Sequence, residues 1–237
     1  GYNGSGIYKN TNHGESWTNV SPNNEIMNIT DLCDDGSNIY ASSYNSGIFI
    51  SSDKGGSWTQ IGDQIKANHI TAIAVSNDTI VAGTDGYGIF ISPNGGASWF
   101  NISKGLFHRD ISNIVITASN SIVAASYSGM VYYSNDLSGS WEASASQDII
   151  NDMIVASSGR VYAATEGRSL IYSDNGATSW EVLSDRLYDE NSETYSDMEH
   201  LNTTSIAIYN NTIVIGTASK GIYYYMQAPV SAWVKAS

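Results

Sequence analysis

Three tyrosines are the residues of this chain whose type and spacing most clearly suit ligand binding. Tyr44, Tyr87 and Tyr127 recur at similar intervals, each in a turn-rich segment with Asn, Asp or Ser nearby. A tyrosine ring can stack on an apolar surface while its hydroxyl group forms hydrogen bonds, which suits a sugar or a peptide. Tyrosines that pack against a neighbouring element are the alternative. Both interpretations require elements that place the three residues at equivalent positions.

Metal binding and catalysis have no comparable pattern. His69, His108 and His200 lie in different segments and lack the short spacing of zinc ligands. No Asp-x-Asp-x-Asp-Gly calcium loop is present, and neither a nucleophile elbow nor a phosphate-binding glycine loop occurs. We therefore expect no metal, no cofactor and no catalytic residue, and we expect the histidines to be exposed polar residues.

The composition narrows the classes of partner. The 237 residues include 23 acidic and 10 basic ones, which gives a formal net charge of -13. Such a surface repels phosphate backbones, so we expect no nucleic-acid binding. Hydrophobic residues make up 41% of the chain, which is too many for a wholly disordered protein. The apolar runs are far shorter than the ~20 residues of a membrane-spanning helix.

An internal repeat supplies the elements that position these residues. Five copies of one turn motif, Ser-x-Asp/Asn-x-Gly-x-Ser-Trp with substitutions, occupy residues 10–17, 51–58, 92–99, 134–141 and 173–180, which we call the repeated turns. A worn sixth copy ends at Trp233. The third position of the five turns is Asn12, Asp53, Asn94, Asp136 or Asn175, and the six tryptophans are Trp17, Trp58, Trp99, Trp141, Trp180 and Trp233.

Three short apolar runs precede each of the last five copies, and a fourth run starts at the tryptophan. Alternating runs rich in Ile, Val and Tyr between Gly, Asn, Asp and Ser turns indicate strands joined by hairpins, here named A to D. A four-stranded sheet of about 40 residues cannot bury both of its faces alone, so successive sheets must stack. The sequence therefore predicts an all-β fold, a β-propeller of four-stranded antiparallel blades.

The predicted propeller has five full blades plus a half blade. We expect a single domain over residues 1–237, with blades at about 1–20 (the half blade), 21–62, 63–103, 104–144, 145–183 and 184–237. Only a C strand precedes the first repeated turn, whereas residues 203–237 already hold a complete set of strands. We therefore expect a longer parent of six to eight blades whose preceding strands complete the first blade. Completion by another chain is the alternative.

Each repeated turn has a structural explanation. The side-chain oxygen at the third position can accept hydrogen bonds from backbone N–H groups of its own turn, and glycine at the fifth position supplies a positive φ. The tryptophan carries a large apolar ring into the space between neighbouring sheets. Ser138 and Ala177 replace the glycine in the fourth and fifth turns, so we expect these two turns to be strained or differently shaped.

The repeated turns resemble the Asp-box, or BNR, repeats of sialidase-like and xyloglucanase-like propellers, and the resemblance covers essentially the whole chain. It implies that the turns are structural and lie on the face opposite the active or binding site. Sialidases bind a substrate carboxylate with three arginines. Arg109, Arg168 and Arg186 offer such a triad, but the Arg-Ile-Pro motif of that family is absent. A glycoside hydrolase, or a fragment of one, is therefore the alternative to a binding protein.

A binding surface is expected on the loop face, which is the end of the blades that carries the B–C and D–A connections. The opposite end, the turn face, carries the A–B and C–D turns. A long acidic insertion between Glu181 and Leu201 also belongs to the loop face, where long loops often carry function. The site residues that we predict on the loop face are Tyr44, Tyr87, Tyr127, Arg109, Arg168, Arg186 and Tyr188.

The function predicted from the sequence is binding without catalysis. We expect an extracytoplasmic propeller, secreted or on the cell surface, that binds a glycan, a peptide or a protein partner on the loop face. A purely structural scaffold is a further alternative, because nothing in the sequence identifies the ligand.

Overall fold

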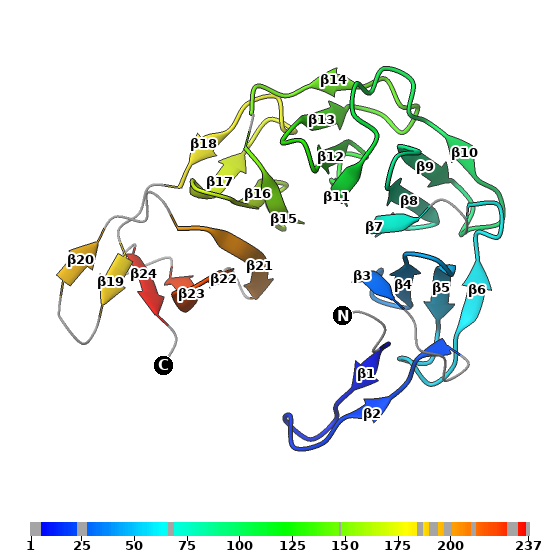
Figure 1. Ribbon diagram of the computed structural model, residues 1–237, viewed down its shortest axis with the longest axis horizontal. Coiled ribbons are helices and arrows are strands. Elements are labelled where there is room, and N and C mark those ends of the chain that lie inside the picture. Colours follow the sequence, from blue (N-terminus) through cyan, green and yellow to red (C-terminus); the bar gives the residue numbers. More distant parts are fainter. Residues whose placement is uncertain are drawn as a thin grey trace. The chain divides into compact units, whose positions relative to one another are not determined.

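The protein is built almost entirely of antiparallel strands. The computed structural model describes residues 6–22, 28–65, 69–146, 148–183, 187–189, 194–196, 201–209, 212–226 and 232–235 (Figure 1). The strands form one two-stranded sheet, four four-stranded sheets and one six-stranded sheet. The prediction of a β-propeller made of four-stranded antiparallel blades is therefore confirmed.

The chain divides into two compact units, which are described separately. Unit 1 comprises Gly1–Ile116 and Leu137–Gly139, and unit 2 comprises Thr117–Asp136 and Ser140–Ser237. In unit 1, the two-stranded sheet pairs β1 (Tyr8–Lys9) with β2 (Thr18–Asn19). The next sheet has the order β3 (Ile29–Asp34), β4 (Ile39–Ser43), β5 (Gly47–Ser51), β6 (Thr59–Ile61). The sheet after it contains β7 (Ile70–Ser76), β8 (Thr79–Thr84), β9 (Ile89–Ser92) and β10 (Phe100–Asn101).

The remaining sheets follow the same order of strands along the chain. One contains β11 (Ile111–Ile116), β12 (Ile122–Ser126), β13 (Val131–Ser134) and β14 (Glu142–Ala143). The next contains β15 (Ile150–Val155), β16 (Val161–Thr165), β17 (Ser169–Ser173) and β18 (Glu181–Val182). The last contains β21 (Thr203–Tyr209), β22 (Thr212–Thr217), β23 (Gly221–Met226) and β24 (Ala232–Lys235).

Part of the acidic insertion adds two strands to the last sheet. Strands β19 (Leu187–Asp189) and β20 (Thr194–Ser196) form an antiparallel hairpin, and β19 pairs in parallel with β24. The sequence predicts a long loop here instead. The short Leu-Tyr-Asp and Thr-Tyr-Ser runs carry the aromatic and β-branched residues that favour strands, but each run is too short to be recognised without its partner.

Burial explains why the strand runs differ in character. All five residues of β12 are buried, as expected for a strand that is covered on both faces. Both residues of each outer strand β10, β14 and β18 are exposed. The second strands therefore appear in the sequence as continuous apolar runs. The outer strands have no clear hydrophobic pattern, and only the tryptophan before each of them predicts its position.

The first strands of neighbouring sheets lie side by side and are joined by polar side chains. In unit 1, β7 contacts both β3 and β11, and in unit 2 β15 contacts β21 (Figure 1). Thr30 Oγ1 donates to the carbonyl of Ile70 at 2.9 Å, and Asn151 Nδ2 donates to the carbonyl of Thr203 at 2.7 Å. These donors lie where β3 and β15 each shift register against the next strand of their sheet. A bulge of this kind redirects side chains, here toward the next sheet.

Two aspartates make a second set of links between sheets. Asp31 Oδ2 accepts the backbone N–H of Ile73 at 3.0 Å, and Asp152 Oδ2 accepts that of Ile206 at 2.9 Å. Desolvation raises the pKa of Asp152, while the backbone N–H groups of Ile206 and Met153 act against this shift by stabilising the carboxylate. The aspartate side chains thus supply hydrogen-bond acceptors for the backbone N–H groups of Ile73 and Ile206 in the next sheet.

The repeated turns share one hydrogen-bond network. In residues 92–99, Asn94 Oδ1 accepts the backbone N–H of Ser98 at 2.9 Å, and Ser92 Oγ accepts that of Gly96 at 2.8 Å. The turns at 51–58 and 173–180 have the same two bonds, and at 10–17 the side chain of Asn10 replaces the serine hydroxyl. The network uses residues within one eight-residue segment, so each turn can form locally.

In the second, third and fifth turns, the fifth residue is seated against residues at or just beyond the outer strand of the preceding sheet. A Cβ placed on Gly96 (φ +91°) would lie 2.9 Å from Ile61 Cδ1, so this position needs glycine for both its φ and its space. Ala177 (φ +73°) occupies the same position in the fifth turn, where it faces the smaller Ser144, whose Oγ donates to the Ala177 carbonyl at 2.6 Å.

In the fourth turn, the residue with a positive φ comes one position later than in the other turns. Ser138 stands at the fifth position, but it is Gly139 that has the positive φ, +80°, and a Cβ there would meet Ile102. The turn is therefore differently shaped, as we expected. In the fifth turn, by contrast, the shape is kept and Ala177 adopts the left-handed conformation.

Trp58, Trp99 and Trp180 pack against the preceding sheet, whereas Trp17 does not. Trp58 is half-buried beside Val20, and its Nε1 donates to the Val20 carbonyl at 2.6 Å. Trp180 Nε1 donates to Ser144 Oγ at 2.9 Å. Trp17 is 62% exposed, so the prediction that it lies between sheets is wrong. Among the described residues, no sheet precedes β1 and β2 that could cover this ring.

The seating of the turns predicts unequal effects of alanine at two adjacent glycines. Gly95 (φ +65°) has no atom within 4 Å of the position that a Cβ would take, whereas Gly96 faces Ile61. Gly95→Ala should lower the free energy of unfolding by about 1 kcal/mol through backbone strain alone. Gly96→Ala should lower it by a further amount of about 1 to 3 kcal/mol through overpacking. Urea denaturation of both variants measures the difference, and equal losses would contradict the proposed seating.

The network also predicts how acid affects the second turn. Hydrogen bonds from the side chain and backbone of Ser57 lower the pKa of Asp53 from 3.8 to about 2. The carboxylate therefore stabilises the fold above about pH 4, and this contribution is lost as the pH falls toward about 2. Asp53→Asn reproduces the residue of the third turn, so it should retain stability at pH 7 and reduce the loss in acid. Asp78→Asn, which removes an exposed carboxylate outside the turns, is the control. An unchanged acid transition in Asp53→Asn would contradict the prediction.

Candidate functional site

The loop face of unit 1 brings several of the predicted residues onto connected loops. The B–C loops between β4 and β5 and between β8 and β9 meet the D–A connections that lead into β7 and β11. We call this area the unit 1 loop surface. Its defining residues are Tyr44, His69, Asp85, Tyr87, Phe107 and Arg109.

Tyr44 mainly links two neighbouring loops of this surface. Its ring stacks on His69 with centroids 4.5 Å apart and planes 8° from parallel, and its hydroxyl donates to Asp85 Oδ2 at 2.6 Å. The Asp85 backbone N–H donates in turn to the His69 carbonyl at 3.0 Å. One face of the Tyr44 ring is thus covered, so Tyr44 fixes the geometry of two loops rather than presenting an open aromatic face.

Tyr87 is held on a rigid loop with its side chain exposed. Its carbonyl accepts a hydrogen bond from Asn101 Nδ2 at 3.1 Å, and the next residue, Gly88, donates its N–H to the Arg109 carbonyl at 3.1 Å. A Cβ on Gly88 would collide with Ser103, so only glycine allows this approach. The Tyr87 side chain is nevertheless 51% exposed. The loop is therefore positioned, while the ring remains available.

Phe107 is an aromatic residue of this surface that is not among the predicted site residues. Its side chain is 83% exposed, whereas the adjacent Leu106 is buried at 8% and closes a turn with Ser103 through a 3.2 Å backbone hydrogen bond. The signal in the sequence is the Leu-Phe pair between Lys104 and Arg109, in an otherwise polar stretch of the connection. The pattern does not show which member of the pair is buried.

Basic residues accompany Phe107 in this otherwise acidic protein. Lys104, His108 and Arg109 are all exposed in the connection between β10 and β11. Asp110 directly follows Arg109, and Asp85 lies on the neighbouring β8–β9 loop. Asp85 already accepts a hydrogen bond from the Tyr44 hydroxyl. The surface therefore combines apolar rings with exposed basic side chains that stand beside two carboxylates.

The predicted residues of unit 2 are placed differently. Tyr127 is 60% exposed in the loop between β12 and β13. Arg168 Nε lies 3.2 Å from Asp148 Oδ1, and the Asp148 side chain is only 12% exposed. The charge of Arg168 is therefore compensated within the protein, which weakens its case as a free carboxylate ligand.

The three arginines of the predicted triad fall in different parts of the chain, so the triad stays a prediction. Arg109 belongs to unit 1 and Arg168 to unit 2, while Arg186 lies outside the described residues. Tyr188 lies in β19, of which the backbone is described. Over the ranges given above, no three His, Cys, Asp or Glu side chains gather in a way that could hold a metal ion. In the same ranges, no helix is long and apolar enough to cross a bilayer.

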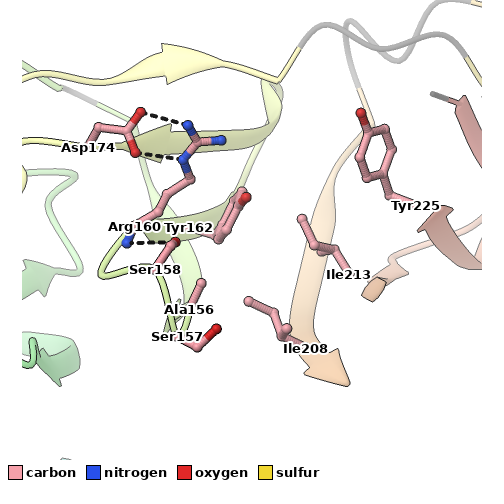
Figure 2. A pocket seen from close by; sticks show the side chains of 9 residues that line it. All are labelled: Ala156, Ser157, Ser158, Arg160, Tyr162, Asp174, Ile208, Ile213 and Tyr225. Carbon is pink, nitrogen blue, oxygen red and sulfur yellow. Dashed lines mark hydrogen bonds and ion pairs between the residues drawn. The ribbon is translucent and has the colours of Figure 1, made fainter. Parts of the chain in front are cut away.

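The turn face of unit 2 contains two hollows that the sequence does not predict. One, of about 440 Å³, lies between the β15–β16 hairpin and strands β21 to β23 (Figure 2). The other, of about 470 Å³, lies among the turns at 117–121, 158–160 and 174–176. Arg160 and Asp174 line both hollows. Arg160 is expected in an A–B hairpin on this face, but its position beside aromatic residues from another strand cannot be read from one hairpin.

Comparisons by sequence identify no relatives. No protein-family model matches the chain, and no curated protein sequence matches it either.

Solved structures with the same fold do match. A structure of YCF48 bound to a D1 peptide is 16% identical with a TM-score of 0.62, and the match covers 87% of this chain and 66% of that one. An ancestral GH74 enzyme is 19% identical with a TM-score of 0.64, covering 87% and 31%. The extracellular domain of a putative hybrid two-component system from B. thetaiotaomicron is 18% identical with a TM-score of 0.65, covering 96% and 30%. This chain spans less than two thirds of each of these structures and shares with them the β-propeller fold.

Proposed function

We propose that this chain is a non-catalytic propeller of the Asp-box type whose unit 1 loop surface binds an extended segment of a peptide or protein. We also propose that it acts outside the cytoplasm. The repeated turns support the Asp-box assignment because four of them share the Ser or Asn side-chain network, and those at 51–58, 92–99 and 173–180 also seat on the preceding sheet.

The exposure of Phe107 is the observation that carries the proposed binding function. A phenylalanine that is 83% exposed beside a buried leucine keeps a large apolar surface in water. Tyr87, on a loop joined to the same connection by hydrogen bonds, adds a second exposed ring. Exposed aromatic side chains on a rigid support are typical anchors of protein interfaces, because little conformational entropy is lost when they are buried.

The charges near Phe107 favour a partner with carboxylates. Lys104 and Arg109 are exposed within a few residues of the ring, in a chain whose net charge is -13. An acidic group on the partner would be repelled by most of the protein and attracted here, which selects orientation as well as affinity. A peptide segment that alternates apolar and acidic residues fits this surface best. The structural neighbour that holds a peptide is consistent with this class of ligand.

Removal of the exposed ring should weaken binding to such a segment. The measurement is fluorescence anisotropy with labelled peptides of about 12 residues whose acidic and apolar contents vary independently. For the peptides that bind, Phe107→Ala should raise the Kd at least tenfold, in the range of an interface anchor. Phe100→Ala is the matched control, because Phe100 is 56% exposed but lies on the outer strand β10. An equal effect of both variants would overturn the assignment of the surface.

A glycosidase assay separates binding from catalysis. We expect no turnover of a panel of aryl glycosides, including a sialoside, by the wild-type protein. Turnover that is abolished by Arg109→Ala or Arg168→Ala would replace the proposal with the glycoside hydrolase alternative, for which the GH74 neighbour is the precedent. Failure of every peptide and every glycoside to bind would favour the structural scaffold.

A further inference from the structure

We propose a second binding site, on the turn face of unit 2, that takes a neutral oligosaccharide across the Arg160–Asp174 ridge. The ridge is the boundary between the two hollows of that face, which have volumes of about 440 and 470 Å³. Volumes of this size are within the range of small-ligand sites, about 300 to 1,000 Å³. This site is built from A–B and C–D turns of unit 2 rather than from the loops of the unit 1 loop surface, and it does not depend on the peptide-binding proposal.

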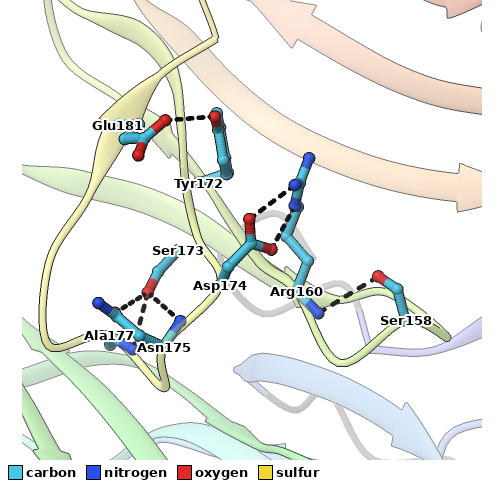
Figure 3. Close-up of polar contacts among 8 residues, drawn as sticks. All are labelled: Ser158, Arg160, Tyr172, Ser173, Asp174, Asn175, Ala177 and Glu181. Carbon is cyan, nitrogen blue, oxygen red and sulfur yellow. Dashed lines mark hydrogen bonds and ion pairs between the residues drawn. The ribbon is translucent and has the colours of Figure 1, made fainter.

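The ridge is a rigid, planar polar group. Arg160 Nε donates to Asp174 Oδ1 and Arg160 Nη2 donates to Asp174 Oδ2, each at 2.7 Å (Figure 3). The guanidinium carbon lies 4.2 Å from the centroid of the Tyr172 ring. Tyr172 is itself fixed by its hydroxyl, which donates to Glu181 Oε2 at 2.5 Å. The bidentate pair is therefore held in place before any ligand arrives, which reduces the entropy lost on binding.

The pair is neutral as a whole but still offers hydrogen bonds. The hydrogen bond to Asp174 raises the pKa of Arg160, and the hydrogen bond from Arg160 lowers the pKa of Asp174, so both groups remain ionised near neutral pH. The guanidinium has N–H groups that Asp174 does not use, and each carboxylate oxygen has a further lone pair. Adjacent sugar hydroxyl groups can donate to the carboxylate and accept from the guanidinium at once, because a hydroxyl does both.

Ile208, Ile213 and Tyr225 form an apolar wall that faces this ridge across the first hollow (Figure 2). Tyr162 lies on the side of the ridge, with its ring centroid 5.8 Å from the guanidinium carbon of Arg160. Ser157 and Ser158 also line the hollow. An aromatic ring can pack against the C–H face of a sugar while the hydroxyl groups at the sugar's edge reach polar neighbours. A wall of this kind beside a planar polar pair matches a pyranose ring, which has apolar faces and a polar rim.

The second hollow extends the site in the direction of more polar side chains. Ser119, Ser121, Asn135 and Asn175 contribute hydroxyl and amide groups around the other side of the ridge. A chain of several sugar units could therefore place one ring against the tyrosines and the next among hydroxyls and amides. Since the charge of Arg160 is already compensated by Asp174, a phosphate or carboxylate ligand would be repelled by the adjacent Asp174 carboxylate, so the arrangement favours an uncharged ligand over an anionic one.

The test uses neutral oligosaccharides with the whole 237-residue chain. Cellotetraose, xylotetraose, maltotetraose and chitotetraose are titrated into the protein by isothermal calorimetry and by amide chemical-shift mapping. At least one of them should bind with a Kd below about 10 mM, the weak end of measurable affinity, and shift the amides of residues 156–162 and 174–176. Absence of binding by all four, or shifts confined to the loop face, would overturn the proposal.

Substitutions then separate the ridge from other parts of the protein. Arg160→Met should raise the Kd at least tenfold, because it removes donors and leaves the Asp174 carboxylate unpaired. Arg168→Met is the matched control, since Arg168 forms the comparable ion pair with Asp148 on the loop face, and it should leave the Kd within twofold, as expected of a site that it does not contact. Equal weakening by both arginine variants would overturn the assignment of the ridge.

A second variant guards against loss of folding. If Arg160→Met lowers the melting temperature strongly, Asp174→Asn keeps the size of the side chain and one acceptor oxygen while it removes the second charge-assisted bond. This variant should also raise the oligosaccharide Kd, and an unchanged Kd would contradict the proposal. In the same preparations, Phe107→Ala should leave oligosaccharide binding unchanged. Failure of the peptide experiment and failure of this one are therefore distinguishable.

Discussion

The stacking of the sheets depends on the close seating of the repeated turns, from the second copy onward, against the outer strand of the preceding sheet. The fifth residue of the turn needs a positive φ and has little room for a side chain, as at Gly96 beside Ile61. The tryptophan three residues later also contacts the preceding sheet, as when Trp58 Nε1 donates to the Val20 carbonyl. At the inner strands, side chains such as Thr30 and Asp31 bind the backbone of the next sheet. Neighbouring sheets are thus joined both at their inner, first strands and at their outer, last strands.

The fold could be predicted from the sequence because its signal is local. The bonds made by Asn94 and Ser92 lie within one eight-residue segment, so the turn appears in the sequence as a motif wherever it occurs. The features that could not be predicted depend on what another sheet supplies. Ala177 tolerates its position because Ser144 faces it, and Trp17 is exposed because the described chain places no sheet against it. The motif shows which residues form the turn, but it does not show whether the neighbouring sheet supplies the space and the packing partner for them.

The same limit applies to the candidate sites. Tyr87 and Arg109 could be assigned to one face from strand order alone, and the hydrogen bond from Gly88 to Arg109 joins their loops. Phe107 could not be recognised, because only the packing of Leu106 decides which of two adjacent apolar residues is exposed. The Arg160–Asp174 ridge joins an A–B hairpin to a C–D turn, and the wall that faces it comes from the following sheet. Such a site has no sequence pattern of its own, since its residues come from three separate local motifs.

The direction of the seating also has a consequence for synthesis. Each turn and tryptophan rests on strands made earlier in the chain, as Trp58 does on Val20, which is 38 residues before it, and Trp180 on Ser144. A sheet that leaves the ribosome therefore meets a docking surface that already exists, and it does not have to wait for a later one. Domains and repeats generally fold in the order in which they are synthesised. Here the repeated turn makes that order a property of the interface itself, so each new sheet can dock as soon as its own turn and tryptophan have been synthesised.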